Sequence, residues 1–159
     1  MIIDPEARRF VESQRVGRLA TADERGRPHV VPICFALDGA TLYTPIDEKP
    51  KAGDYTRLRR LRSIAVNPHV QVLLDLYDDA DWSCLRYVQL RGTARVIDGG
   101  EEHTRAIALL RARHEQYVAM KLDARPVIAV DVERVVQWSA AHGSASRKTL
   151  DSDNTEGLP

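Results

Sequence analysis

The chain has 159 residues, of which 43% are hydrophobic and 29% charged, with 23 basic and 23 acidic side chains. This length and composition predict one globular domain with a hydrophobic core of its own. The formal net charge of zero argues against a dedicated nucleic-acid-binding protein, because such proteins carry a basic domain or face. The N-terminus has no signal-peptide pattern, and no apolar run approaches the ~18 residues of a membrane span, so we expect a cytoplasmic protein without a membrane partner.

The first part of the chain predicts one short helix and three antiparallel strands. Asp4 and Pro5 form an N-cap and first-position pair that starts a helix ending near Gln14. From Val16 the apolar period changes to two, and polar or Asp-Gly turns separate the segments. Pro32 lies inside the second strand, which indicates a sheet edge, a bulge or an opening in the ladder. The three strands are expected at 16–22, 28–37 and 40–44.

The second part predicts two helices, three strands and a polar tail. Leu58, Leu61 and Ile64 recur at helical spacing until Asn67-Pro68 stops the pattern. A helix over about 101–122 carries an apolar stripe, on which we interpret His114 as a packing histidine. Strands are expected at 70–77, at 82–98 with Gly92 as a bulge and Val88, Leu90, Ala94 and Val96 on one face, and at 127–140. Residues 1–140 are thus interpreted as one domain and 141–159 as a flexible tail.

This order of elements predicts a mostly β fold with peripheral helices. Helix, three strands, helix, two strands, helix and strand, joined by tight turns, suit an antiparallel barrel better than parallel βαβ units. Cys34 and Cys84 lie in apolar stretches and are expected to be core residues of a reducing compartment. We interpret the acidic run 78–81 as a solvated hairpin turn. The sequence contains no CxxC, HExxH, nucleophile elbow or Gly-rich phosphate loop, so we predict no metal ligand.

A basic stretch between Lys49 and Arg62 is the strongest functional signal. It holds six basic residues and one acid, and two readings stay open. The arginines are either a solvated helix face, or they join the loop lysines at a helix N-terminus that already favours anions. A compact phosphate site fits better than a DNA groove, which needs an extended basic stripe. The basic residues are Lys49, Lys51, Arg57, Arg59, Arg60 and Arg62.

Three segments together resemble a known family. They are "GRLATADERGRPHVVPICFALDGATLYT", the basic loop and helix ending in "NP", and "DWSCLRYVQLRGTARV". They resemble the pyridoxamine 5'-phosphate oxidase-like split-barrel family, and within it the actinobacterial branch that uses the deazaflavin coenzyme F420. The resemblance runs from about Arg9 to Trp138. It implies a six-stranded antiparallel split β-barrel, a homodimer, and a flavin-type cofactor at the subunit interface.

The resemblance also implies the residues of the site. Arg59 and Arg60 stand where FMN-binding relatives grip the phosphate, and the loop of Lys49 and Lys51 resembles the deazaflavin version, whose cofactor has an acidic tail. The complete implied cofactor-binding set is Lys49, Lys51, Arg57, Arg59, Arg60, Thr44, Pro32 and Ile33, with Trp82 and Tyr87 shaping the pocket from the partner subunit. The Arg-Leu-x-Pro signature of true pyridoxamine phosphate oxidases is replaced by "VVQWSAAHG", so vitamin B6 oxidation is not expected.

The function implied is an F420-dependent oxidoreductase that transfers hydride to an activated C=C or C=N bond of a small molecule such as a quinone, enone or tetrapyrrole-like compound. Such chemistry requires no general base or nucleophile, so no catalytic side chain is expected. The protein contributes orientation, electrostatics and exclusion of water. Two alternatives remain: an FMN-dependent oxidoreductase of the same fold, and a non-catalytic flavin-, deazaflavin- or haem-binding protein.

Overall fold

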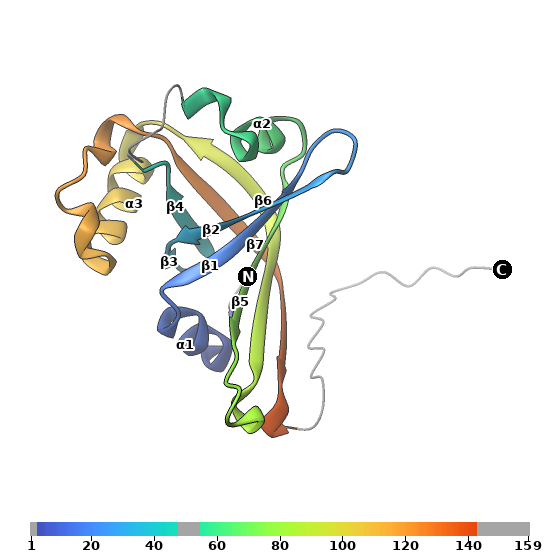
Figure 1. Ribbon diagram of the computed structural model, residues 1–159. Coiled ribbons are helices and arrows are strands. Elements are labelled where there is room, and N and C mark those ends of the chain that lie inside the picture. The colour runs from blue at the N-terminus through green and yellow to red at the C-terminus, as the bar shows by residue number, and fades with distance from the viewer. Residues whose placement is uncertain (1–2, 48–54, 143–159) are drawn as a thin grey trace, which may run out of the picture.

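The computed structural model describes residues 3–47 and 55–142 of the chain (Figure 1). The helices are α1 (Pro5–Ser13), α2 (Arg59–Val66) and α3 (Gly100–Arg113). The strands are β1 (Val16–Ala22), β2 (Pro28–Cys34), β3 (Ala36–Asp38), β4 (Thr41–Pro45), β5 (His69–Leu76), β6 (Arg86–Ile97) and β7 (Val127–Ser139). Short 3₁₀ turns are η1 (Tyr55–Arg57), η2 (Trp82–Cys84), η3 (Glu115–Tyr117), η4 (Leu122–Ala124) and η5 (Ala140–His142).

The strands form one antiparallel sheet in the order β2-β1-β5-β6-β7-β4-β3. The mostly β split-barrel class is therefore confirmed, with seven strands in place of the expected six. The expected strand 28–37 divides at Phe35, which is fully buried between β2 and β3. Its two halves lie at opposite edges of the sheet, so the chain can cross from one edge to the other only if the sheet curls. The curl brings β2 against β4 and leaves a seam between them.

Gly92 marks an irregularity in the long pairing of β6 with β7, as the sequence predicts. The register shifts between Arg91 and Gly92. A β-carbon added at Gly92 would lie 1.9 Å from the carbonyl oxygen of Asp131, so no side chain fits there. Of the four residues expected on one face of this strand, Val88, Leu90 and Ala94 are buried, whereas Val96 is 43% exposed. Val96 lies beyond the pairing of β6 with β5, which ends at Thr93.

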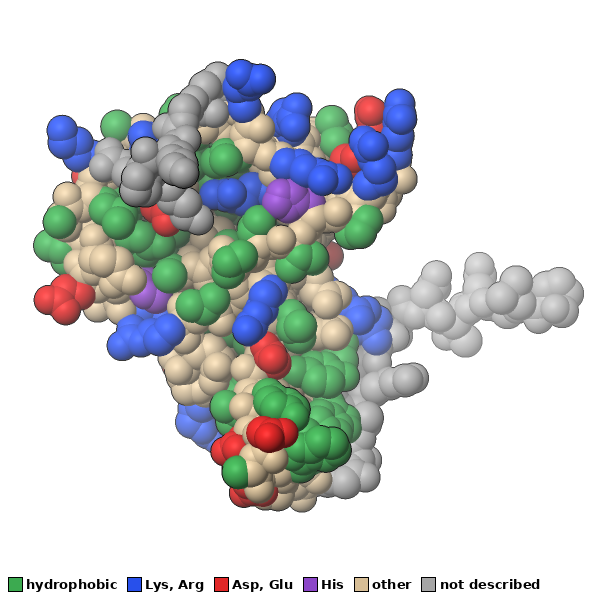
Figure 2. Space-filling model, in the orientation of Figure 1, with side chains coloured by type: hydrophobic (Ala, Val, Ile, Leu, Met, Phe, Trp, Pro, Cys, Tyr) green, Lys and Arg blue, Asp and Glu red, His purple; other side chains and the backbone are tan. Residues whose placement is uncertain are grey.

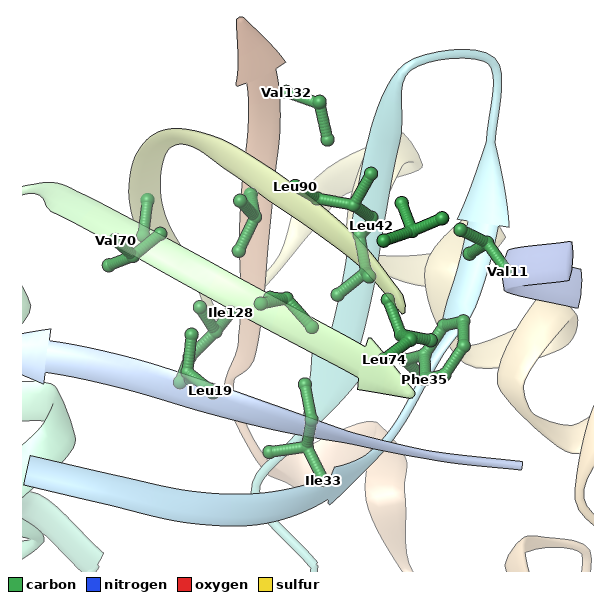
Figure 3. Packing of buried hydrophobic residues seen from close by; sticks show 14 of the residues in the cluster. Val11, Leu19, Ile33, Phe35, Leu42, Val70, Leu74, Leu90, Ile128 and Val132 are labelled. Atoms are coloured by element: carbon green, nitrogen blue, oxygen red, sulfur yellow. The ribbon is translucent and has the colours of Figure 1, made fainter. Parts of the chain in front are cut away.

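The main hydrophobic core fills the inside of the curled sheet. Figure 3 shows side chains from β1, β2, β5, β6 and β7 pointing into the same space, with Phe35 at one end. Leu19, Leu74, Leu90 and Ile128 are fully buried there. Alternate residues of each strand supply this interior, which is why the period-two pattern located the strands.

A second core lies outside the sheet, under α3. It joins Ile107 and Leu110 of α3 to Tyr43 of β4 and to Val127 and Ala129 of β7. The first half of β7 is therefore covered on both faces, and its sequence VIAV is apolar without interruption.

The third helix is shorter than predicted. It ends at Arg113, because His114 has an extended backbone (φ −127°, ψ 103°), and η3 follows. The prediction of a helix to Leu122 is wrong. Tyr117 and Leu122 are buried as helical spacing suggests, but 3₁₀ turns and tertiary packing bring them there. His114 is a buried packing histidine as predicted, and its Nε2 lies 2.9 Å from the carbonyl oxygen of Phe35.

The two smaller helices follow the predictions. Asp4 caps α1 by accepting hydrogen bonds from the backbone N–H groups of Glu6 and Ala7. Leu58, Leu61 and Ile64 pack α2 on the main core, at the opposite end of the sheet from α1 (Figure 1). No helix among the described residues is both long and apolar enough to cross a membrane.

The segment before β6 differs from the prediction. Trp82–Cys84 form the turn η2, which Asp81 caps by accepting a hydrogen bond from the backbone N–H of Ser83, so β6 begins only at Arg86. Cys84 is exposed in this turn, and its prediction as a core residue is wrong. Cys34 is half-buried. Of the predicted tail, residues 143–159 lie outside the described residues.

Candidate functional site

A cavity of about 210 Å³ opens at the seam between β2 and β4, beside α2. The curl of the sheet creates it, because β2 and β4 face each other there without pairing. Its apolar wall comes from the start of β1, the end of β2 and the end of β4, while polar groups come from α2 and from beyond α3. The lining residues are Val16, Pro32, Ile33, Cys34, Thr44, Pro45, Asp47, Arg60 and Tyr117.

Arg60 is the cationic group of this cavity. Apolar residues of α2 hold the helix on the core, and this position places Arg60, which is half-buried, at the cavity wall. Burial lowers the pKa of Arg60, and the charge of Asp47 opposes that shift. The guanidinium nevertheless keeps its proton at neutral pH. Among the described residues no carboxylate lies within the 4.0 Å of an ion pair with Arg60, so its charge is available to a ligand.

The start of α2 adds positive potential beside the cavity. Arg59 is its first residue, and its N-cap residue Leu58 has no side chain that could cap the free N–H groups. Burial lowers the pKa of His29 on β2, and the charges of Arg59 and Arg60 lower it further, so the imidazole is neutral. Figure 2 shows Lys and Arg side chains along the upper part of this face, over α2 and the β1–β2 turn, with hydrophobic side chains below. The arrangement suits a compact anion.

Hydroxyl and thiol groups of Thr44, Tyr117 and Cys34 also line the cavity. Burial raises the pKa of Tyr117, and Cys34 and Asp47 raise it further, so the phenol stays protonated. Thr44 is buried on β4 at the same cavity. These groups can offer hydrogen bonds to the polar rim of a flat ligand that packs against Pro32 and Ile33.

The structure brings together four of the ten predicted site residues. Pro32, Ile33, Thr44 and Arg60 line one cavity, and β2 is an edge strand of the sheet, as Pro32 suggests. Arg59 is exposed and close enough to His29 to affect its pKa.

The other predicted residues that the structure describes lie elsewhere. Arg57 is exposed on η1, and Lys49 and Lys51 lie outside the described residues. Trp82 and Tyr87 lie at the far end of the β5–β6 hairpin and do not line this cavity of their own chain. Trp82 is 64% exposed, and Tyr87 stacks on Trp138 with ring centroids 5.9 Å apart.

Sequence reasoning missed six further residues at the site. Five of them line the cavity (Val16, Cys34, Pro45, Asp47 and Tyr117), and His29 lies near Arg59 and Arg60. Val16 and Cys34 are register partners on β1 and β2, so the predicted hairpin could have placed Val16 beside Ile33. Asp47 follows the predicted strand that holds Thr44 by three positions. Tyr117 and His29 had no local signal, because their neighbours come from distant segments.

A curled antiparallel barrel with a basic helix beside a cavity at its seam is the arrangement of a split-barrel protein. Residues 3–139 match the family described as pyridoxamine 5'-phosphate oxidase, and the chain therefore belongs to that family.

One curated relative is the 5a,11a-dehydrotetracycline/5a,11a-dehydrooxytetracycline reductase of Streptomyces rimosus, which is 33% identical over 94 residues. The match covers 58% of this chain and 63% of the reductase, so the chain spans less than two thirds of that protein.

Solved structures share the fold at low identity. HutZ, the heme storage protein of Vibrio cholerae, has a TM-score of 0.66 at 20% identity and covers 87% of this chain and 95% of its own. An FAD-binding protein of Mesorhizobium loti has a TM-score of 0.61 at 23% identity, with coverages of 85% and 94%. At these identities the likeness concerns the fold alone.

Proposed function

We propose that this protein is an oxidoreductase that binds coenzyme F420 and reduces an activated C=C or C=N bond of a small molecule. The observation that carries the proposal is the position of Arg60. A half-buried guanidinium without an ion-pair partner among the described residues lines a cavity that also contains the apolar residues Pro32 and Ile33 and one carboxylate, Asp47, beyond ion-pair distance. Burying such a charge is unfavourable unless an anion compensates it.

The residues present fit a phosphorylated ring cofactor. Arg60, Arg59 and the uncapped N-terminus of α2 would hold the phosphate through charge-assisted hydrogen bonds. Pro32 and Ile33 would pack against one face of the ring system, and Thr44 would hydrogen-bond to its polar edge. Lys49 and Lys51, which precede α2 in the sequence, would meet the acidic tail. This last contact favours F420 over FMN, because FMN has no such tail.

Reduced coenzyme F420, when bound, supplies a hydride. The protein's own contribution is to bind and orient the reactants and to exclude water. Tyr117 keeps its phenolic proton because burial raises its pKa, so its hydroxyl group is a hydrogen-bond donor among the residues that line the cavity. The relative from Streptomyces rimosus is named a reductase of dehydro compounds, which supports reduction as the direction of the reaction.

We also propose a homodimer in which Trp82 and Tyr87 complete the site of the partner. Leu76, Tyr77 and Trp82 are 43%, 61% and 64% exposed near one end of the β5–β6 hairpin. Such apolar exposure favours burial against another chain. A cavity of about 210 Å³ is small for a three-ring cofactor, so a second wall from a partner would complete it.

A panel of cofactors tests the proposal. The purified protein is titrated with coenzyme F420, FMN and haem at moderate salt, and sedimentation velocity gives its mass with and without cofactor. We expect F420 to bind at micromolar concentration or below, and the mass to be twice 17.9 kDa. Tight FMN binding without F420 binding would show the FMN-dependent alternative. Cofactor binding without turnover across quinone and enone acceptors would favour a carrier or sensor.

A further inference from the structure

A second cavity, of about 580 Å³, adjoins the first. Both cavities are lined by Val16 and Cys34, which are register partners at the start of β1 and the end of β2. From this shared wall the second cavity runs along the C-terminal end of α3, where Arg15, Arg113 and His114 line it. Its volume falls in the range of cavities that bind organic molecules of several rings.

Two guanidinium groups give this cavity an unbalanced positive charge. Arg15 Nη1 donates a hydrogen bond to the carbonyl oxygen of Arg113 at 2.6 Å. Arg113 Nη2 donates to the carbonyl oxygens of Glu12 and Gln14 at 2.7 and 2.6 Å. All these acceptors are neutral carbonyl groups. Within the described ranges no carboxylate forms an ion pair with either arginine.

The charge of Arg113 has neutral partners: the two carbonyl oxygens and the Phe35 ring, whose centroid lies 5.0 Å from Cζ. Its Nε is buried and has no hydrogen-bond partner among the described residues. Burial lowers the pKa of Arg113, and the charge of Arg15 lowers it further, against a smaller opposite effect of Glu12. The Glu12 carboxylate is itself paired with Arg8 at 2.9 Å. Two neighbouring cations of this kind form a site for a carboxylate or a similar group.

The remaining polar groups at the cavity do not cancel that charge. Arg111 is paired with Asp123 at 2.7 Å. His114 donates Nε2–H to the carbonyl oxygen of Phe35, and burial lowers its pKa, so the ring is neutral. Glu115 is the acidic residue among the described residues that line the cavity, and it is exposed. The cavity therefore has one acidic residue against two guanidinium groups that have no carboxylate partner among the described residues.

We propose that this second cavity binds the acceptor of the reaction and selects a planar organic anion, whose carboxylate, sulfonate or enolate group meets Arg15 and Arg113. The apolar part of this anion packs against Val16, Cys34 and Val118, and so reaches the wall that the two cavities share. The role as acceptor rests on the proposed function. The anion selectivity follows from the charges of this cavity alone.

A matched pair of probes separates charge from shape. The probes are 1-anilinonaphthalene-8-sulfonate and its uncharged analogue N-phenyl-1-naphthylamine, titrated by fluorescence into the full chain without cofactor. We expect Arg15→Gln to weaken binding of the sulfonate about tenfold, since it removes one charge-assisted interaction, and to leave the neutral probe within about twofold. Arg15→Lys, which keeps the charge, should retain most of the affinity.

Arg25→Gln is the control, because it removes the same charge from the exposed β1–β2 turn, away from both cavities. It should change neither probe. Equal losses for both probes in Arg15→Gln, or a thermal midpoint that falls while sulfonate affinity stays constant, would mean that Arg15 only caps α3, and would overturn the proposal. If the variant does not fold, the wild type decides: sulfonate binding that does not weaken with added salt also overturns it.

The same titration with saturating F420 keeps the two proposals distinguishable. Because the cavities share only the Val16–Cys34 wall, the sulfonate should still bind. Failure of F420 to bind, with the probe results as expected, would refute the proposed cofactor and support the anion site. F420 binding, together with sulfonate affinity that does not depend on Arg15, would support the proposed cofactor and refute the anion site.

Discussion

Replacing Arg60 with methionine should weaken cofactor binding while leaving the fold intact or slightly more stable. Methionine keeps the length and the apolar stem of the side chain but removes the guanidinium. Arg60 is half-buried and has no ion-pair partner among the described residues, so in the protein without cofactor the charge of Asp47 offsets only part of its desolvation cost. Removing the charge should raise the free energy of unfolding by about 0–1 kcal/mol.

The expected loss of binding free energy for F420 is larger than the expected gain in folding stability. A charge-assisted hydrogen bond to phosphate contributes ~1.5–3 kcal/mol, and Arg60 is the described guanidinium that lines the cavity. We therefore expect a loss of about 2–3 kcal/mol, which is a Kd for F420 weaker by ~30- to ~150-fold. Fluorescence titration gives the Kd, and urea unfolding gives the stability.

Arg62→Met is the matched control. Arg62 is exposed on the same helix and does not line the cavity, so its replacement removes equal charge and should change the Kd by less than about threefold. Equal losses in Arg60→Met and Arg62→Met would indicate a diffuse electrostatic effect and refute the reasoning. An unchanged Kd in Arg60→Met would remove Arg60 from the site altogether.

Three further predictions concern the fold. Gly92→Ala should lower the free energy of unfolding by about 3 kcal/mol, because its β-carbon would meet the carbonyl oxygen of Asp131 at 1.9 Å. Glu102→Gln should cost about 1 kcal/mol at neutral pH, since the carboxylate accepts two hydrogen bonds from Arg95 at 2.7 Å but is partly exposed. Wild-type stability should fall as the pH drops below 6.5, because burial lowers the pKa of His114 in the folded state, and His114→Gln should reduce that slope.

Urea unfolding at several pH values checks all three. Gly99→Ser, which meets open space, is the control for Gly92 and should change stability by only a few tenths of a kcal/mol. Arg95 lowers the pKa of Glu102 from 4.5 to about 2. The contribution of the ionised Glu102 carboxylate to folding stability is therefore complete above pH 4.5 and disappears as the pH falls through about 2. The difference in stability between the wild type and Glu102→Gln should vanish over that range. A difference that is independent of pH would contradict the assignment, as would an unchanged slope in His114→Gln.

Local patterns were sufficient for most elements of the fold. The cap at Asp4, the strand periodicity and the apolar side of α2 are properties of neighbouring residues, and the structure confirms each of them. Gly92 was also identifiable, because a glycine within a long strand signals a bulge or a close approach of backbone. The resemblance to a known family added the prediction that Arg60 and Pro32 belong to one site.

Tertiary packing decided the rest. The strand 28–37 reads as continuous, and only closure of the sheet divides it at Phe35. Helical spacing of apolar residues continues beyond Arg113, but the α-helix ends there and a 3₁₀ turn follows. At this point His114 donates a hydrogen bond to the carbonyl oxygen of Phe35, 79 residues away. Exposure of Cys84 follows from the turn before β6.

The residues that line the two cavities were also partly predictable from local patterns and partly decided by tertiary packing. Sequence spacing by itself determined which residues share a strand face or a helix side, and therefore placed Pro32, Ile33 and Thr44 on strands and Arg60 on a helix. It could not bring Tyr117 to Cys34, or Arg15 to Arg113, which are 98 residues apart and hydrogen-bonded. These long-range contacts depend on how the sheet curls and where α3 ends. Both are set by the sum of many distant contacts, which no short stretch of the chain contains.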